Sequence, residues 1–124
     1  MQIETASALE SVSSIAALPG VDVLLIGPFD LGNNIGRPIL DGKIHAELQD
    51  AIERIKEAAH GAGKKVGIYC TGGEQAREFA EQGFDMISVA ADMIALPKAF
   101  GDALAVAKGG KKLAGKVGGG YDGR

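Results

Sequence analysis

Residues that cross-link or anchor a small protein are scarce in this sequence. It has a single cysteine, no tryptophan and 5% aromatic residues among its 124 positions. One cysteine excludes a disulfide framework and a cysteine-rich zinc site. No apolar run approaches the roughly 18 residues that a membrane-spanning helix needs. The chain also opens without a basic and apolar leader segment, so the sequence predicts a cytoplasmic protein with no membrane partner.

Positive charge is not in excess either. The formal net charge is −3, which argues against nucleic acid as a partner, because a protein surface that binds nucleic acid must be positive. Hydrophobic residues make up 46% of the chain and charged residues 23%, the composition of a globular domain. Glycine is abundant, with 19 residues, and it gathers near the end of the chain. Residues 108–124 are rich in glycine and basic residues and are predicted to form a flexible tail.

Short apolar runs alternate with helical patterns four times along the chain. The expected strands are a segment that ends at Glu4 and residues 21–26, 66–70 and 86–90. The expected helices run from Thr5 or Ser7 to before Pro19, from His45 to Ala62, from Glu74 to Gln82 and from Met93 to Ala107. Residues 27–42, rich in glycine, proline, asparagine and aspartate, are expected to form a long loop.

Repeated strand–helix units predict an α/β fold with a parallel sheet. Two architectures fit four such units: an open doubly wound sheet, or half of an eight-unit barrel. The sequence favours the barrel, because the chain opens on the end of its first strand. We therefore expect a partial (β/α)8 TIM barrel made of the last four βα units, with residues 1–107 as the half-barrel.

In such folds, reactive groups gather where parallel strands end. Glu4 ends the first strand, with Gln2 on the same face, and Asp30 follows the second strand. Two carboxylates at one edge can hold a hard divalent cation. The alternative is that both are charges at helix N-termini, stabilised by the helix dipole. Gly27 and Pro28 leave the backbone amides of the next residues open to a ligand carboxylate.

Other polar residues carry weaker signals. Cys70 is expected to be a buried structural thiol, and Gly72-Gly73 a plain turn rather than a phosphate site. The remaining candidates, predicted to have surface or capping roles, are His45, His60, Asp92 and Arg37. For Arg37, the alternative is a contact with an acidic substrate.

Several motifs resemble the carboxyl-terminal half of a known family. They are Gln2-Ile3-Glu4-Thr5, Leu18-Pro19-Gly20-Val21-Asp22, Ile26-Gly27-Pro28-Phe29-Asp30-Leu31, Gly36, Gly63-Lys64, Gly83-Phe84 and Ser88-Val89-Ala90-Ala91-Asp92. The sequence is similar to the HpcH/HpaI aldolase/citrate lyase family, and most similar to its metal-dependent pyruvate aldolases, over about residues 1–107.

The resemblance implies an enzyme, a carbon–carbon lyase that cleaves 4-hydroxy-2-oxo acids to pyruvate and an aldehyde through a metal-stabilised enolate. It implies that Glu4 and Asp30 bind a divalent cation (Mg²⁺, Mn²⁺ or Co²⁺) and that Gln2 contacts the pyruvate moiety. It also implies that the backbone of Gly27, Pro28, Phe29 and Asp30 receives the substrate carboxylate. A homo-oligomer is implied for the full-length protein.

The family's acid–base group, a His–Asp pair, and its carboxylate-binding arginine have no counterpart in this sequence. We therefore expect no catalytic residue in this half and little or no activity from the chain alone. Phe29 replaces a smaller residue of the family and is expected to narrow the mouth of the site. The alternatives are an acyl-CoA lyase of the citrate or malyl type, a non-catalytic α/β binding module, and a non-catalytic half-barrel that only associates with a complementary half.

Overall fold

The computed structural model describes residues 1–110 of the chain. The chain divides into two compact units, Met1–Val89 and Ala90–Arg124. The first unit contains all four strands of the sheet, and the second contains the last helix. Residues 111–124 of the predicted tail lie outside the described residues.

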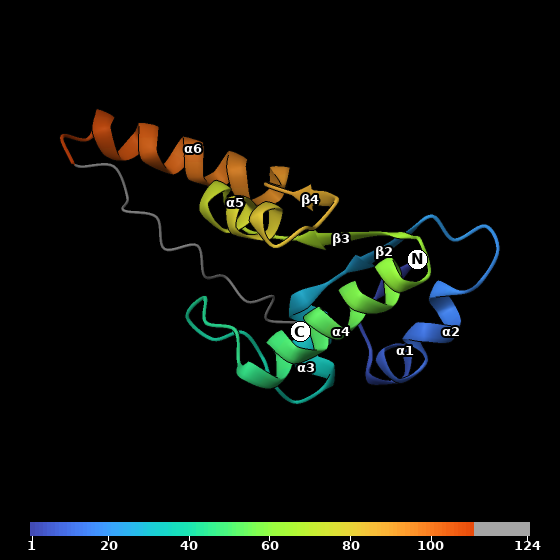
Figure 1. Ribbon diagram of the computed structural model, residues 1–124. Helices are drawn as coiled ribbons and strands as arrows, with labels where there is room; N and C mark the ends of the chain where they lie inside the picture. Colours follow the sequence, from blue (N-terminus) through green and yellow to red (C-terminus); the bar gives the residue numbers. More distant parts are fainter. Residues whose placement is uncertain (111–124) are drawn as a thin grey trace. The chain divides into compact units, whose positions relative to one another are not determined.

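The first unit is built on one four-stranded parallel sheet (Figure 1). Its strands are β1 (Gln2–Ile3), β2 (Val23–Ile26), β3 (Lys65–Tyr69) and β4 (Met86–Ser88), and they lie side by side in the order of the sequence. A doubly wound sheet requires a point at which the strand order reverses. The sequential order therefore excludes that alternative and confirms consecutive βα units of the barrel type.

Five helices connect these strands. They are α1 (Ala6–Glu10), α2 (Val12–Ala16), α3 (Pro28–Asn34), α4 (Ala46–Gly61) and α5 (Gly73–Glu81). A single helix was expected before Pro19, but Ser11, with φ −93° and ψ 6°, divides it into α1 and α2. Gly83 has a φ of +88°, the left-handed conformation expected after α5.

The core of this unit lies between the sheet and α4. Leu24 and Ile26 of β2 stand level with Val66 and Ile68 of β3, and all four side chains are fully buried. α4 packs on both strands and presents its own apolar stripe, Leu48, Ile52, Ile55 and Ala59. This stripe follows the 3.6-residue period predicted from the sequence, and its burial anchors the helix.

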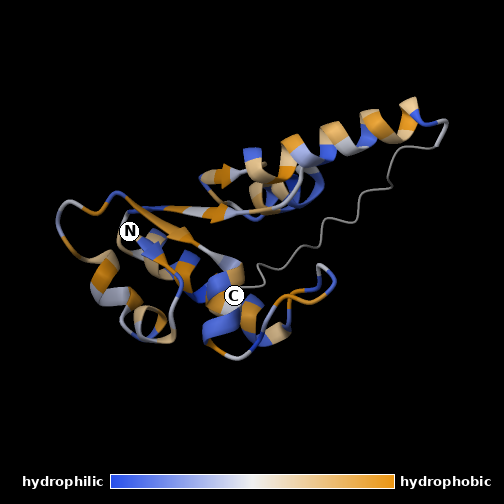
Figure 2. Ribbon diagram, turned by 180° about the vertical axis from the view of Figure 1, so that it is seen from behind, coloured by the Kyte–Doolittle hydropathy of each residue, from blue (hydrophilic) through white to orange (hydrophobic). Residues whose placement is uncertain are grey.

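The second unit contains α6 (Asp92–Ala107). This helix has no buried residue, and Figure 2 shows hydrophobic residues along its length. Its large exposed apolar side chains are Met93, Ile94, Leu96, Phe100, Leu104 and Val106. Ala91, and not Asp92 as predicted, is the N-cap residue, and the Asp92 carboxylate accepts from the adjacent amide of Met93.

Among residues 1–110, no helix combines the length and the hydrophobicity needed to cross a membrane.

Candidate functional site

The carboxyl ends of β1 and β2 bring Gln2, Glu4 and Gly27 together. β1 and β2 are parallel, with Gln2 level with Leu25 and Ile3 level with Ile26. The next residues, Glu4 and Gly27, therefore lie side by side at the carboxyl edge of the sheet. The backbone amide of Gly27 donates to the carbonyl of Ile3 at 3.4 Å, which holds the two strand ends together.

The side chains of Gln2 and Glu4 are joined above Gly27. The Gln2 amide Nε2 donates to Glu4 Oε2 at 2.7 Å. A Cβ atom added at Gly27 would lie 3.1 Å from Gln2 Nε2 and 3.5 Å from Glu4 Oε2. The absent side chain of Gly27 is therefore what leaves room for this Gln2–Glu4 pair.

Asp30 reaches the same edge from a helix and not from a loop. The long loop predicted over residues 27–42 is wrong in its first half, because α3 begins at Pro28. Proline suits the first position of a helix, where its fixed φ is already helical and its missing N–H has no partner to lose. Asp30 lies in the first turn of this helix, with an exposed side chain. This position suits a charge that the helix dipole stabilises, and it leaves the carboxylate accessible to a cation.

The rest of the predicted loop folds back tightly on α3. The Arg37 amide donates to the Gly32 carbonyl at 2.7 Å. Asp41 and Gly42 both have positive φ angles, 51° and 74°, in a turn between the paired residues Leu40 and Lys43. Two positive φ angles in succession are what a type I′ turn requires.

Two aromatic rings adjoin the site residues. Phe29 of α3 meets Tyr69, the last residue of β3, with ring centroids 6.3 Å apart and an interplanar angle of 64°. The sequence did not single out Tyr69, because the predicted strand ends one residue later, at Cys70. Successive side chains of a strand point to opposite faces of the sheet. Because Cys70 is fully buried on one face, this alternation could have placed Tyr69 on the other face.

The residue types at this edge suit a hard cation. Two carboxylates, Glu4 and Asp30, come from adjacent strand ends, and among residues 1–110 neither has an ion pair with a basic side chain. Carboxylate oxygens are the ligands that Mg²⁺ and Mn²⁺ prefer. The described residues hold no cluster of three or more His, Cys, Asp or Glu side chains suited to a metal ion. Any cation here must therefore take further ligands from outside the pair.

Several other predicted residues lie outside this cluster. The Arg37 guanidinium donates to Glu47 at 3.0 Å and to the Gly36 carbonyl, so its contacts are within the protein. The hydrogen bond with Arg37 lowers the pKa of Glu47. His45 is the N-cap of α4 and accepts from the Glu47 amide at 3.3 Å, as one of its predicted roles.

Cys70 is fully buried, as predicted, and its Sγ donates to the Ser88 carbonyl at 2.9 Å. Gly72 is the N-cap residue of α5, without a side-chain cap, and Gly73 begins the helix.

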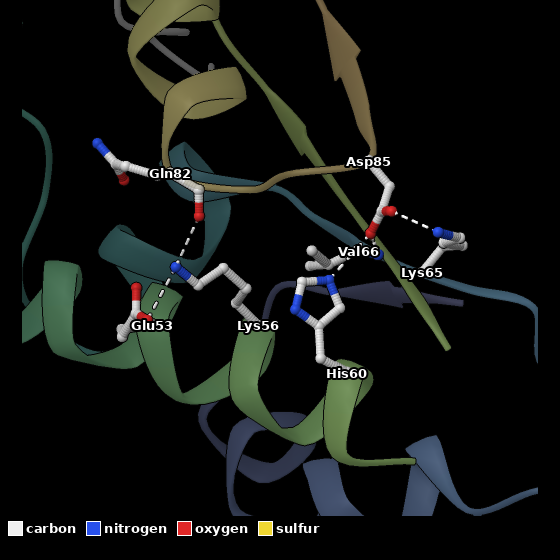
Figure 3. A network of polar contacts seen from close by, with 7 residues as sticks. All are labelled: Glu53, Lys56, His60, Lys65, Val66, Gln82 and Asp85. Carbon is white, nitrogen blue, oxygen red and sulfur yellow. Dashed lines mark hydrogen bonds and ion pairs between the residues drawn. The ribbon is translucent and has the colours of Figure 1, made fainter. Parts of the chain in front are cut away.

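A polar network that the sequence did not predict occupies the opposite, amino-terminal edge of the sheet (Figure 3). Asp85 immediately precedes β4 and accepts from Lys65 Nζ at 2.7 Å, from the Val66 amide at 3.0 Å and from His60 Nε2 at 3.0 Å. The bond from Lys65, then those from Val66 and His60, hold the pKa of Asp85 far below its usual range. His60 therefore lies in a structural contact, away from the Gln2–Glu4 pair.

Comparisons with known proteins agree with this architecture. The HpcH/HpaI aldolase/citrate lyase family matches residues 1–99. A hydroxypyruvate/pyruvate aldolase from Rhizorhabdus wittichii is 39% identical over 106 residues, which are 86% of this chain and 42% of the relative. A 5-keto-4-deoxy-D-glucarate aldolase from Enterobacter sp. is 37% identical over 93 residues, 75% of this chain and 36% of the relative.

Among solved structures, an HpcH/HpaI family protein from Burkholderia cenocepacia superposes with a TM-score of 0.78 at 37% identity. The match covers 86% of this chain and 41% of that protein. The chain thus spans about two fifths of the length of the proteins it matches. The strand order agrees with these matches, and the chain belongs to the HpcH/HpaI aldolase/citrate lyase family.

Proposed function

We propose that this chain supplies the cation-binding and pyruvate-binding half of an aldolase. The reaction is the reversible cleavage of 4-hydroxy-2-oxo acids to pyruvate and an aldehyde. The observation that carries the proposal is the Gln2–Glu4 pair above Gly27, at the carboxyl edge where a barrel holds its reactants. Two relatives named as aldolases of 2-oxo acids support the substrate class.

Glu4 and Asp30 are the proposed ligands of a divalent cation. Gln2 donates to one oxygen of Glu4 at 2.7 Å and so fixes the orientation of that carboxylate. A bound divalent cation supplies positive charge that stabilises the negative charge developing on the substrate's keto oxygen.

The backbone from Gly27 to Asp30 is the proposed binding site for the substrate carboxylate. The first amides of a helix have no partner within the helix, so the first turn of α3 offers donors to an anion. Gln2, at the same strand ends, is the proposed contact for the pyruvate moiety. Phe29 and Tyr69 meet beside these groups and are expected to limit the width of the mouth on that side.

An acid–base group must come from elsewhere in the complete protein. His45 caps α4, and His60 bonds Asp85 at the amino-terminal edge, so we assign neither histidine to proton transfer. We therefore expect the 124-residue chain by itself to release little or no pyruvate from a 4-hydroxy-2-oxo acid. Sustained pyruvate release by the purified chain with Mn²⁺ would contradict this part of the proposal.

Manganese titration tests the cation site directly. Electron paramagnetic resonance of free Mn²⁺ measures uptake by the full chain and by the Glu4→Gln and Asp30→Asn variants. Each substitution is expected to weaken uptake about ten-fold or more, because each removes one of two anionic ligands. Asp50→Asn, an exposed carboxylate on α4, is the matched control. Equal uptake by all four proteins would overturn the assignment of Glu4 and Asp30.

Complementation tests the reaction. The chain is co-expressed with the amino-terminal portion of the Rhizorhabdus wittichii relative, and the complex is assayed with 4-hydroxy-2-oxo acids and with acyl-CoA thioesters. Pyruvate release that depends on Glu4 supports the aldolase. Turnover of the thioesters alone would favour the acyl-CoA lyase alternative.

A further inference from the structure

We infer that Asn34 is a positioning residue that sets the arrangement of Glu4 and Asp30, an inference that rests on the proposed function. The Oδ1 atom of Asn34 accepts a hydrogen bond from the backbone amide of Ala6 at 2.8 Å. The two residues are 28 positions apart in the sequence. This bond ties the segment after β1, which carries Glu4, to the helix after β2, which carries Asp30.

At the β1 end, the bond is made by a backbone amide two residues after Glu4. Ala6 is the first residue of α1, and its N–H is one of the amides that a helix leaves without an internal partner. Thr5, the N-cap residue, satisfies the Ala8 amide through its Oγ1 at 3.2 Å. α1 has only five residues, so few internal bonds hold its first turn. The bond that Ala6 donates to Asn34 therefore fixes where the Glu4–Ala6 segment lies.

At the α3 end, Asn34 lies four residues after Asp30 in the same helix. Residues four apart lie on the same face of a helix. The hydrogen bond from the Ala6 amide to Asn34 Oδ1 therefore turns the face that carries Asp30 toward the segment that carries Glu4. Asn34 contributes no charge to the cation, and its effect on binding passes through the position of these two carboxylates.

Removing a partner that hydrogen-bonds a metal ligand directly weakens metal affinity about 10- to 100-fold, and Asn34 acts one step further out, through a backbone amide. Asn34 is exposed, so the lower end of that range is expected here. We expect Asn34→Ala to bind Mn²⁺ about ten-fold more weakly than the unaltered chain. Asn33→Ala, the exposed neighbour on the same helix, is the matched control and is expected to bind Mn²⁺ normally.

A second variant removes the same bond from the other side. Ala6→Pro deletes the donor N–H at the first helical position, where proline is tolerated. Thr5 already has φ −129° and ψ 156°, the conformation that a residue before proline prefers. If one bond is responsible, Ala6→Pro also weakens Mn²⁺ binding about ten-fold, and the double variant is no weaker than either single variant.

Three readouts decide the outcome for the full chain: Mn²⁺ affinity by electron paramagnetic resonance, the thermal midpoint by circular dichroism, and amide exchange of Thr5 and Ala6. For Asn34→Ala, the inference predicts weaker Mn²⁺ binding and faster exchange of the Thr5 and Ala6 amides, with a thermal midpoint close to that of the unaltered chain. Normal Mn²⁺ affinity in Asn34→Ala, or a double variant weaker by the product of both effects, would overturn it.

The proposed function fails in a different way. If the unaltered chain takes up no Mn²⁺, or Glu4→Gln takes up as much, the proposed cation site is wrong. Amide exchange then still tests Asn34 alone, and unchanged exchange of Ala6 in Asn34→Ala contradicts its positioning role.

Discussion

At the scale of single residues, the candidate site depends on a missing side chain. Gly27 has an ordinary φ of −96°, so its backbone conformation does not require glycine. Its importance is spatial, because a Cβ there would lie 3.1 Å from the Gln2 amide nitrogen. Nε2 is the far end of a flexible side chain, so Gln2 can give way by a few tenths of an ångström, and this shift changes the geometry of its bond to Glu4.

Gly27→Ala is therefore expected to weaken Mn²⁺ binding without a comparable loss of thermal stability. The added methyl group shifts Gln2, disturbs its bond to the Glu4 carboxylate and is expected to weaken Mn²⁺ uptake several-fold, while the thermal midpoint changes little. Gly61→Ala is the control, because a Cβ at Gly61 meets nothing within 4 Å. Manganese titration and thermal unfolding of both variants provide the measurements. A large loss of stability in Gly27→Ala with normal Mn²⁺ uptake contradicts the spatial role.

The sequence alone predicts Glu4 and Asp30 at one edge, because parallel strands end on the same side of a sheet. It could not identify Asn34, because its partner is a backbone amide 28 residues away. Every residue except proline has such an amide, so the residue types give no sign of the bond. The same holds for Asp85, whose three donors come from α4 and β3. Topology places strand-end residues, whereas these hydrogen bonds depend on the packed positions of helices.

At the scale of elements, α3 shows most clearly where pattern and structure differ. Its sequence contains Pro28, Gly32, Asn33 and Asn34, a composition typical of a loop. Close packing explains why position 32 of this helix is a glycine. A Cβ there would lie 2.7 Å from the Arg37 carbonyl oxygen and 2.9 Å from a methyl group of Leu48. α4, in contrast, was predicted to within one residue at each end, since its apolar period is regular.

Asp85 links three elements at the amino-terminal edge, and its charge is expected to stabilise the fold in a pH-dependent way. The pKa of Asp85 is lowered in the folded chain, so folding favours its charged form. That contribution is complete above the unfolded pKa of about 3.9 and is lost as the pH falls toward the lower folded pKa. Asp85→Asn should therefore lower the thermal midpoint at pH 7, with the difference from the unaltered chain shrinking below about pH 4.

Thermal unfolding between pH 7 and pH 3 tests this prediction. Asp50→Asn, an exposed carboxylate on α4, is the control and is expected to show little change at any pH. If the difference in thermal midpoint between Asp85→Asn and the unaltered chain stays constant across this pH range, the lost contacts, and not the charge, account for the effect.

At the scale of the whole molecule, the described sheet has two edges. β1 pairs only with β2, and β4 pairs only with β3, in the order given by the sheet. An eight-stranded barrel has no edges, because each strand has two neighbours. Edge strands with free backbone groups recruit other chains. The 124-residue chain is therefore expected to associate, as its relation to a longer barrel implies.

Light scattering over a range of concentrations measures this association. A lysine beside a free sheet edge should reduce the association, because its charge opposes pairing with another strand. Val89 follows β4 and is 49% exposed, so Val89→Lys places a charge beside the free edge with little loss of packing. Leu18→Lys, at an equally exposed position far from either edge in sequence, controls for the added charge. We expect Val89→Lys alone to shift the chain toward the monomer. A chain that stays monomeric at every concentration would show that its sheet edges are already protected, and equal effects of both lysines would assign the association to general surface hydrophobicity.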